Sequence, residues 1–207
     1  MICTSCLQEF STTPIRGIIE KEPFLCDECI SQIKIRLEHH LLFGIDCLFL
    51  SEYDGIIKKW LMDYKENLDI ELAPCFLFVF LPLLRIKYAG WTFVPLPSNA
   101  LRVEKRGFNH LEEMLKASKL NYLDCLIKEE MIQQKQLGPS ERLSKKNIYL
   151  KKGIDLQGKK IVLFDDVYTS GGTLKNSLSS VIKAHPKEIK ALILMNNGHF
   201  GEKSIQV

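Results

Sequence analysis

The sequence predicts an α/β fold, in which a parallel sheet flanked by helices follows a small cysteine-rich module. Short apolar runs such as residues 161–164 (Ile-Val-Leu-Phe) have the continuous hydrophobicity of strands buried on both faces. Amphipathic runs with helical spacing alternate with them, and two Cys-x-x-Cys pairs stand near the N-terminus. The 207 residues, 46% of them hydrophobic, suffice for one substantial core. We expect a cysteine module over residues 1–36 and an α/β domain over residues 37–207.

The cysteine pairs predict a metal site. They are separated by nineteen residues, a spacing typical of a tetrahedral zinc site whose four thiolate ligands would be Cys3, Cys6, Cys26 and Cys29. Disulfides, which need an oxidising compartment, and a redox-active pair, which needs only one Cys-x-x-Cys, are the alternatives. The module has too few large apolar side chains for a core, so the metal should supply much of its folding free energy. The other cysteines stand in apolar surroundings and are expected to be small buried residues: Cys47, Cys75 and Cys125.

The middle of the chain predicts alternating strands and helices. Apolar residues at helical spacing predict helices over residues 31–42, 56–64 and 111–118. Compact apolar runs predict strands over residues 43–53, 91–94, 122–127 and 189–195. Residues 72–84 contain Pro74 and Pro82, which predicts either a buried helix with a proline near its start or a short helix followed by a loop.

Secretion and membrane insertion are not predicted. The N-terminus lacks a basic segment followed by an apolar core, and the longest apolar run, residues 72–84, is shorter than the roughly 20 residues of a spanning helix. The net charge of +3 does not by itself indicate nucleic-acid binding. We therefore expect a cytoplasmic protein with no membrane partner.

The most informative segment begins where residues 161–164 meet two acids, Asp165 and Asp166. A turn rich in hydroxyl groups and glycine follows, and then apolar residues recur at helical spacing from Leu174 to Ile182. A helix starting there would direct free N–H groups and the positive end of its dipole at an anion in the turn. Carboxylates repel phosphate, so the acids suit sugar hydroxyls or Mg²⁺. The segment predicts a site for a 5-phosphorylated ribose; the alternative is an ordinary strand–turn–helix with a polar turn.

This segment resembles the binding motif for phosphoribosyl pyrophosphate (PRPP) in type I phosphoribosyltransferases. The resemblance implies a parallel sheet with helices on both faces and a variable hood. It also implies that Asp165 and Asp166 hold the ribose 2′ and 3′ hydroxyls and that residues 169–173 cradle the 5-phosphate. The PRPP-binding residues would then be Asp165, Asp166, Val167, Tyr168, Thr169, Ser170, Gly171, Gly172 and Thr173.

Two further loops carry groups suited to an anionic ligand. Pro97 and Ser98 end a rigid turn after the strand over residues 91–94, where the resemblance places the pyrophosphate. Arg102 and Arg106 are four residues apart, so on a helical turn both point to one side and suit a pyrophosphate; the alternative is two solvated arginines. A basic run starts at Arg142 and is either a solvated face or a mobile lid formed by Arg142, Lys145 and Lys146.

Taken in order, these motifs resemble the ComF family of competence proteins. The resemblance rests on the four-cysteine module, Val94-Pro95-Leu96-Pro97-Ser98, Arg102, Arg106-Gly107-Phe108-Asn109, Gln134-x-x-Leu137, Arg142, Asn147 and the acidic segment. Gly172 departs from the pattern only at a position that varies in the family. The resemblance implies PRPP binding with Mg²⁺ and a part in DNA uptake, together with a ComF-type helicase partner.

Three functions remain open. The first is this competence role, and the second is a metabolic phosphoribosyltransferase that acts on a base or nucleotide precursor. The third is a non-catalytic adaptor that binds single-stranded DNA or a protein. Attack at ribose C1 with loss of pyrophosphate needs charge neutralisation and positioning more than a protein nucleophile, so the expected catalytic residues are Asp165, Asp166, Arg102 and Arg106. No residue pattern identifies an acceptor.

Overall fold

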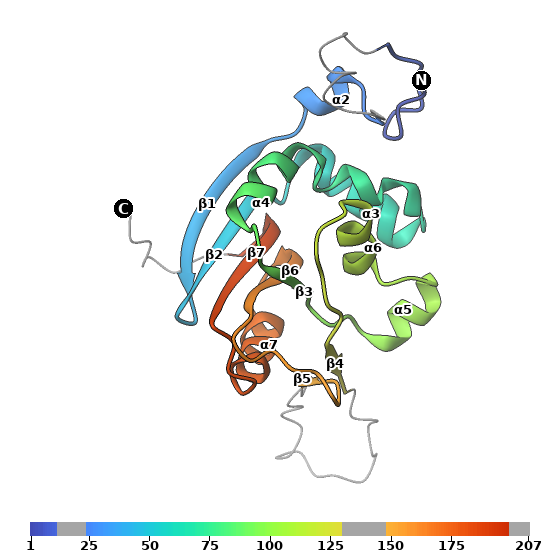
Figure 1. The fold of residues 1–207 in the computed structure, drawn as a ribbon. Coiled ribbons are helices and arrows are strands. Elements are labelled where there is room, and N and C mark those ends of the chain that lie inside the picture. The colour runs from blue at the N-terminus through green and yellow to red at the C-terminus, as the bar shows by residue number, and fades with distance from the viewer. Residues whose placement is uncertain (12–23, 130–147, 199–207) are drawn as a thin grey trace.

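The computed structural model describes residues 1–11, 24–129 and 148–198. Its centre is a five-stranded sheet in the order β1-β2-β7-β6-β3, and a two-stranded sheet pairs β4 with β5 (Figure 1). The strands of the large sheet are β1 (Ile35–Leu42), β2 (Ile45–Glu52), β3 (Thr92–Pro95), β6 (Lys160–Tyr168) and β7 (Glu188–Asn196). The small sheet consists of β4 (Leu126–Lys128) and β5 (Ile148–Leu150).

Four strands of the large sheet run parallel. β6 pairs with β3 on one side and with β7 on the other, and β7 pairs with β2. Residues 161–164 of β6 are completely buried, because neighbouring strands and helices cover them on every side. The strands expected over residues 91–94 and 189–195 are therefore confirmed as β3 and β7.

The sheet is mixed, because β1 is an antiparallel edge strand. A two-residue turn at Phe43 and Gly44, with φ of 52° and 84°, connects it to β2, as in a type I′ hairpin. The helix expected over residues 31–42 is thus wrong, whereas the strand over residues 43–53 is confirmed as β2. From Glu38 to Leu42 every second residue of β1 is half-buried, and this period of two suits a strand that pairs with β2; the register is irregular between Ile35 and Glu38.

Helices pack beside the sheet as the amphipathic runs predicted. α3 (Gly55–Glu66) buries Ile57, Trp60 and Tyr64, and α6 (His110–Ala117) buries Leu111 and Met114. The helix after the acidic pair is α7 (Gly172–Ile182), and two shorter helices are α2 (Asp27–Ser31) and α5 (Ala100–Arg106). Within the described residues, none of these helices has the length and apolar character that a bilayer crossing requires.

The secondary structure of two segments, residues 72–84 and 122–127, differs from the expected one. Residues 72–84 form neither of the expected arrangements but two 3₁₀-helices, η1 (Ile70–Cys75) and η2 (Phe78–Phe80), followed by α4 (Leu81–Lys87). Pro74 lies inside η1 and Pro82 lies at the start of α4, where its missing N–H costs no helical hydrogen bond. Of the strand expected over residues 122–127, only β4 forms, apart from an isolated bridge between Tyr122 and Phe93.

Candidate functional site

The acidic pair lies inside β6, shortly before the last residue of the strand, Tyr168. Neighbouring side chains of a strand point to opposite faces, so Asp165 and Asp166 enter different surroundings. Asp166 is almost fully buried, whereas Asp165 is partly exposed and its Oδ1 accepts a hydrogen bond from the Asp166 N–H at 3.0 Å. The loop of residues 169–171 then leads into α7.

A glycine shapes this loop. Gly171 has φ of 70° and precedes α7 as its N-cap, where it offers no side chain to the first N–H groups of the helix. A Cβ on Gly171 would lie 2.7 Å from Tyr168 Oη and 3.0 Å from Phe43 Cε2. The Tyr168 ring and the tip of the β1–β2 hairpin therefore close around this residue. Thr169 and Ser170, which precede this end of α7, are exposed, and no side chain caps the helix.

Two side chains from other helices contact Asp166. The Lys65 ammonium of α3 forms an ion pair with Asp166 Oδ2, and His110 Nε2 of α6 lies 2.8 Å from the same oxygen. Sequence reasoning missed both residues. Lys65 is one of many surface-type lysines, and the only signal for His110 is its place directly after Asn109, whose side chain caps α6 by accepting from the Leu111 N–H.

The two acids have opposite pKa shifts. Burial and the negative charge of Asp166 raise the pKa of Asp165 from 3.8 to about 8. Burial alone would also raise the pKa of Asp166, but His110 and Lys65 outweigh it and hold this pKa well below its usual range. The opposite shifts favour a single negative charge on the pair at neutral pH, carried by Asp166.

The groups expected on the pyrophosphate side converge only in part. The loop that holds Pro97 and Ser98 is fixed by a hydrogen bond from the Leu96 N–H to the Phe164 carbonyl at 2.8 Å. His110 Nδ1 lies 3.3 Å from Ser98 Oγ and 3.0 Å from Arg106 Nη1.

The two arginines of α5 have different surroundings. The Arg106 guanidinium also lies over the Phe108 ring, with its central carbon 5.8 Å from the ring centroid. Arg102 is exposed, and the structure does not bring it to these contacts. The proposed lid residues Arg142, Lys145 and Lys146 lie outside the described residues.

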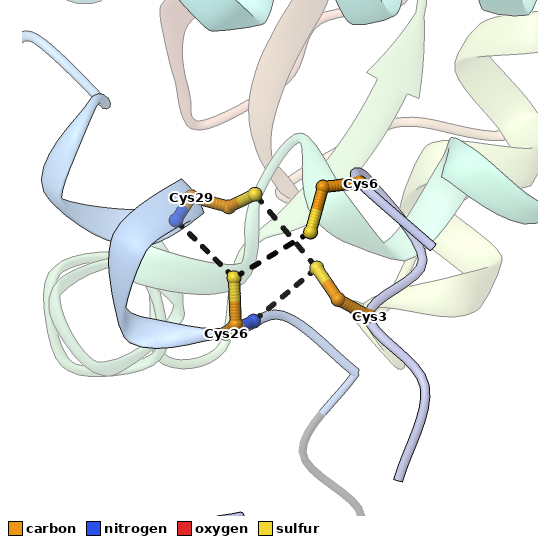
Figure 2. Close-up of side chains that lie close together, drawn as sticks. All are labelled: Cys3, Cys6, Cys26 and Cys29. Carbon is orange, nitrogen blue, oxygen red and sulfur yellow. Dashed lines mark hydrogen bonds between the residues drawn. The ribbon is translucent and has the colours of Figure 1, made fainter. Parts of the chain in front are cut away.

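The four N-terminal cysteines form a compact cluster (Figure 2). Their sulfur atoms all lie within 4.8 Å of one another, and the Cys3–Cys29 and Cys6–Cys26 pairs are each 3.8 Å apart. Thiolates at about 2.3 Å from one tetrahedral zinc ion would be separated by about 3.8 Å, so the donor set fits this metal. All four are free of disulfides.

The cysteine cluster is attached to the rest of the molecule. Trp60 Nε1 of α3 donates a hydrogen bond to Ser5 Oγ at 2.7 Å, and Ser5 lies between the first two cysteines. The Phe24 and Phe78 rings also meet edge to face, with centroids 4.7 Å apart. α3 thus contacts the cluster through Trp60 and the acidic pair through Lys65.

Residues 101–206 match the family described as Phosphoribosyl transferase domain. Competence protein ComFC of Streptococcus pneumoniae (strain ATCC BAA-255 / R6) is 31% identical over 153 residues, which cover 73% of this chain and 69% of the relative. The chain belongs to the ComFC family. Competence protein ComFC of Bacillus subtilis (strain 168), another member, is 28% identical over 183 residues, or 84% of this chain and 74% of the relative.

Solved structures that are similar to part of this chain include two phosphoribosyltransferases. A hypoxanthine-guanine phosphoribosyltransferase from Bacillus anthracis is 13% identical, with a TM-score of 0.40 over 65% of this chain and 74% of that chain. A hypoxanthine phosphoribosyltransferase from Staphylococcus aureus is 12% identical, with a TM-score of 0.40 over 66% of this chain and 70% of that chain. The type I phosphoribosyltransferase-like fold of this chain follows from the domain match, with its parallel strands flanked by helices.

Neighbouring glycines of the loop should differ sharply in their tolerance of alanine. Gly171→Ala should destabilise the protein by more than about 1 kcal/mol, because its φ is positive and the added Cβ meets Tyr168 and Phe43. Gly172→Ala is the matched control: the nearest atom to its Cβ is Ser170 Oγ at 3.8 Å, so we expect a change within about 1 kcal/mol. Urea unfolding measures both, and equal losses would contradict the steric account.

Stability should fall with rising pH because of Asp165. The folded protein keeps a proton on this group up to a pKa of about 8, whereas the unfolded chain, with a pKa of 3.8, releases it earlier. The contribution is therefore complete at low pH and is lost as the pH approaches 8. Asp165→Asn keeps the shape of the protonated acid and cannot ionise. Between about pH 5 and pH 8 the free energy of unfolding should fall more steeply for the unmodified protein than for this variant; parallel curves would refute the assignment.

Proposed function

We propose that this ComFC-family chain binds PRPP together with Mg²⁺ and supports DNA uptake in natural transformation, with a helicase as partner. The observation that carries the proposal is the arrangement at the carboxyl end of β6. An acidic pair, a glycine-shaped loop and the N-terminus of α7 follow one another within a phosphoribosyl transferase domain. The competence role is supported by the two ComFC relatives.

The loop and α7 suit the 5-phosphate. Thr169, Ser170 and Thr173 supply hydroxyl groups, and the first N–H groups of α7 have no carbonyl partner within the helix. The positive end of the helix dipole adds to the attraction. Gly171, in a left-handed conformation that a side chain would strain, sets the path by which the loop enters α7.

The acids suit the ribose hydroxyls. Lys65 and His110 both contact Oδ2 of Asp166, which leaves Oδ1 for a sugar hydroxyl. Asp165, whose pKa is raised, offers in its protonated form a hydroxyl donor as well as an acceptor. A neutral and a charged carboxyl side by side thus match the donor and acceptor capacity of a diol.

Arg106 and Ser98 are the pyrophosphate-side groups that the contacts support best. Among the described residues, Arg106 Nε is buried without a hydrogen-bond partner, so this N–H is available to an anion. Arg102 is exposed on the same helix and would reach the ligand from outside, while Pro97 holds the loop. If transfer from ribose C1 occurs, these arginines neutralise the departing pyrophosphate.

Mg²⁺ fits this site as an ion carried by the ligand. Among the described residues, the one group of three or more potential ligand side chains is the cysteine cluster, so the acids form no metal cage of their own. Mg²⁺ is commonly bound through substrate phosphates and few protein groups, and it would supply further charge neutralisation at the pyrophosphate.

The cysteine cluster is proposed to hold structural zinc in a module over residues 1–36, followed by the phosphoribosyltransferase-like domain over residues 37–207. The separations between its sulfurs support zinc, and four thiolates leave no open coordination position for catalysis. Free thiols persist in reducing compartments, which supports a place in the cytoplasm.

Calorimetric titration with PRPP tests the site. We expect binding in the presence of Mg²⁺, weaker binding without it, and none in the Asp165→Ala/Asp166→Ala variant, because the sugar loses both partners. Asp155→Asn is the matched control, since Asp155 precedes the opposite end of β6 and should bind PRPP normally. Unchanged affinity in the double variant would overturn the site assignment.

Elemental analysis tests the cluster. The purified chain should contain about one zinc ion, as expected of a four-thiolate site. Cys26→Ser should lose the metal and the fold of the N-terminal segment, because metal binding and folding are coupled there. Cys125→Ser, at a buried cysteine outside the cluster, should retain zinc. A folded, metal-free N-terminal segment would contradict the proposal.

A further inference from the structure

The His110 imidazole joins the two halves of the candidate site. Its ring is 6% exposed and is contacted from separate elements of the fold. Nδ1 faces Arg106 of α5 and Ser98 of the loop after β3, and Nε2 faces Asp166 of β6. The Lys65 ammonium of α3 meets the same carboxylate oxygen. Among the hydrogen bonds and ion pairs of the described residues, only those of His110 involve both Arg106 and Asp166.

The partner of Nδ1 determines where the imidazole carries its proton. A guanidinium only donates hydrogen bonds, so the Nδ1 atom 3.0 Å from Arg106 Nη1 must present its lone pair. The proton of the neutral ring then resides on Nε2, which faces Asp166 at 2.8 Å. Burial and the nearby cations Lys65 and Arg106 lower the pKa of His110, which agrees with a neutral ring despite the attraction of Asp166.

We propose that His110 is a positioning residue which, as the neutral tautomer with its proton on Nε2, orients Asp166 toward the ribose and links it to Arg106 on the pyrophosphate side. The inference rests on the proposed PRPP site. His110 itself would not touch the ligand.

Only a neutral imidazole can face both Arg106 and Asp166 in this arrangement. A protonated Nδ1 would repel Arg106 and expel it from its present position. The neutral ring instead accepts a hydrogen bond from Arg106 and turns its Nε2 proton, not a lone pair, toward Asp166. Ser98, Arg106 and Asp166 are thereby held in one chain of contacts. A movement at the pyrophosphate end of the ligand would therefore be transmitted through His110 to the residue at the ribose, and the reverse.

This tautomer predicts how replacements of His110 should affect PRPP binding. A glutamine side chain also has one acceptor and one donor, so His110→Gln should preserve both contacts and bind PRPP within a few-fold of the unmodified protein. His110→Leu has similar bulk and neither group. It leaves Asp166 and Arg106 with unmet hydrogen-bonding groups and should weaken PRPP binding by about 10- to 100-fold. Thermal unfolding of each variant checks that it is folded.

The outcomes separate this inference from the proposed function. If the unmodified protein binds PRPP and His110→Leu binds equally well, or His110→Gln fails as badly as His110→Leu in a folded protein, the positioning role is wrong while the PRPP site stands. If the unmodified protein does not bind PRPP, the site itself is wrong and the inference falls with it.

A spectroscopic measurement tests the tautomer without PRPP. Nitrogen-15 NMR of the unliganded protein at neutral pH should show an unprotonated Nδ1 and a protonated Nε2 for His110, with the signals assigned by their loss in His110→Gln. A proton on Nδ1 would overturn the proposal whatever the binding data. Asp166 faces Nε2 and favours the same tautomer as Arg106, so the proton should stay on Nε2 in Arg106→Met. The pKa of His110 should rise in that variant, because a cation that lowers it is removed; an unchanged pKa would count against the link.

Discussion

The buried carboxylate of Asp166 is the constraint on which the site depends. An ionised acid in the interior is tolerated only when cations and hydrogen-bond donors surround it, because the desolvation of an unpaired charge is too costly. Lys65 from α3 and His110 from α6 surround this carboxylate. Arg106 and Ser98 contact the other nitrogen of the imidazole, Nδ1. α3, α5 and α6 must therefore approach β6 at defined positions. Their placement creates the candidate ligand site beside β6.

The hairpin of β1 and β2, at the edge of the sheet, contacts the loop that is proposed to bind the 5-phosphate. Phe43 at its tip reaches Gly171, and Phe49 of β2 contacts the Tyr168 ring edge to face, with centroids 5.6 Å apart. Phe49 also meets His40 of β1, so aromatic contacts run from the edge strand to the loop. The antiparallel strand, absent from the expected parallel sheet, is what brings an aromatic cover to the proposed phosphate loop.

Local patterns predicted those elements whose periodicity was strong. The buried run over residues 161–164, the helix after Gly171 and the amphipathic helix that buries Trp60 all form. The segment over residues 31–42 was misread because a few apolar residues satisfy a helical and an alternating pattern equally well. The segment forms a strand because it pairs with β2, and such tertiary contacts override a weak local preference for helix. Likewise, Pro74 and Pro82 signalled an irregular segment without specifying 3₁₀-helices.

By itself the sequence determined the ingredients: the order of strand, acids, glycine turn and helix, and the spacing of four cysteines that the structure gathers into one cluster. Chemistry of this kind is encoded locally, because each motif lies within a few neighbouring residues. Only the tertiary structure decided that Asp166 meets Lys65 and His110, that the pKa values of Asp165 and Asp166 shift in opposite directions, and that Arg106 contacts His110. The physical reason is that pKa and pairing depend on burial and on distances between side chains far apart in the chain, which no local pattern contains.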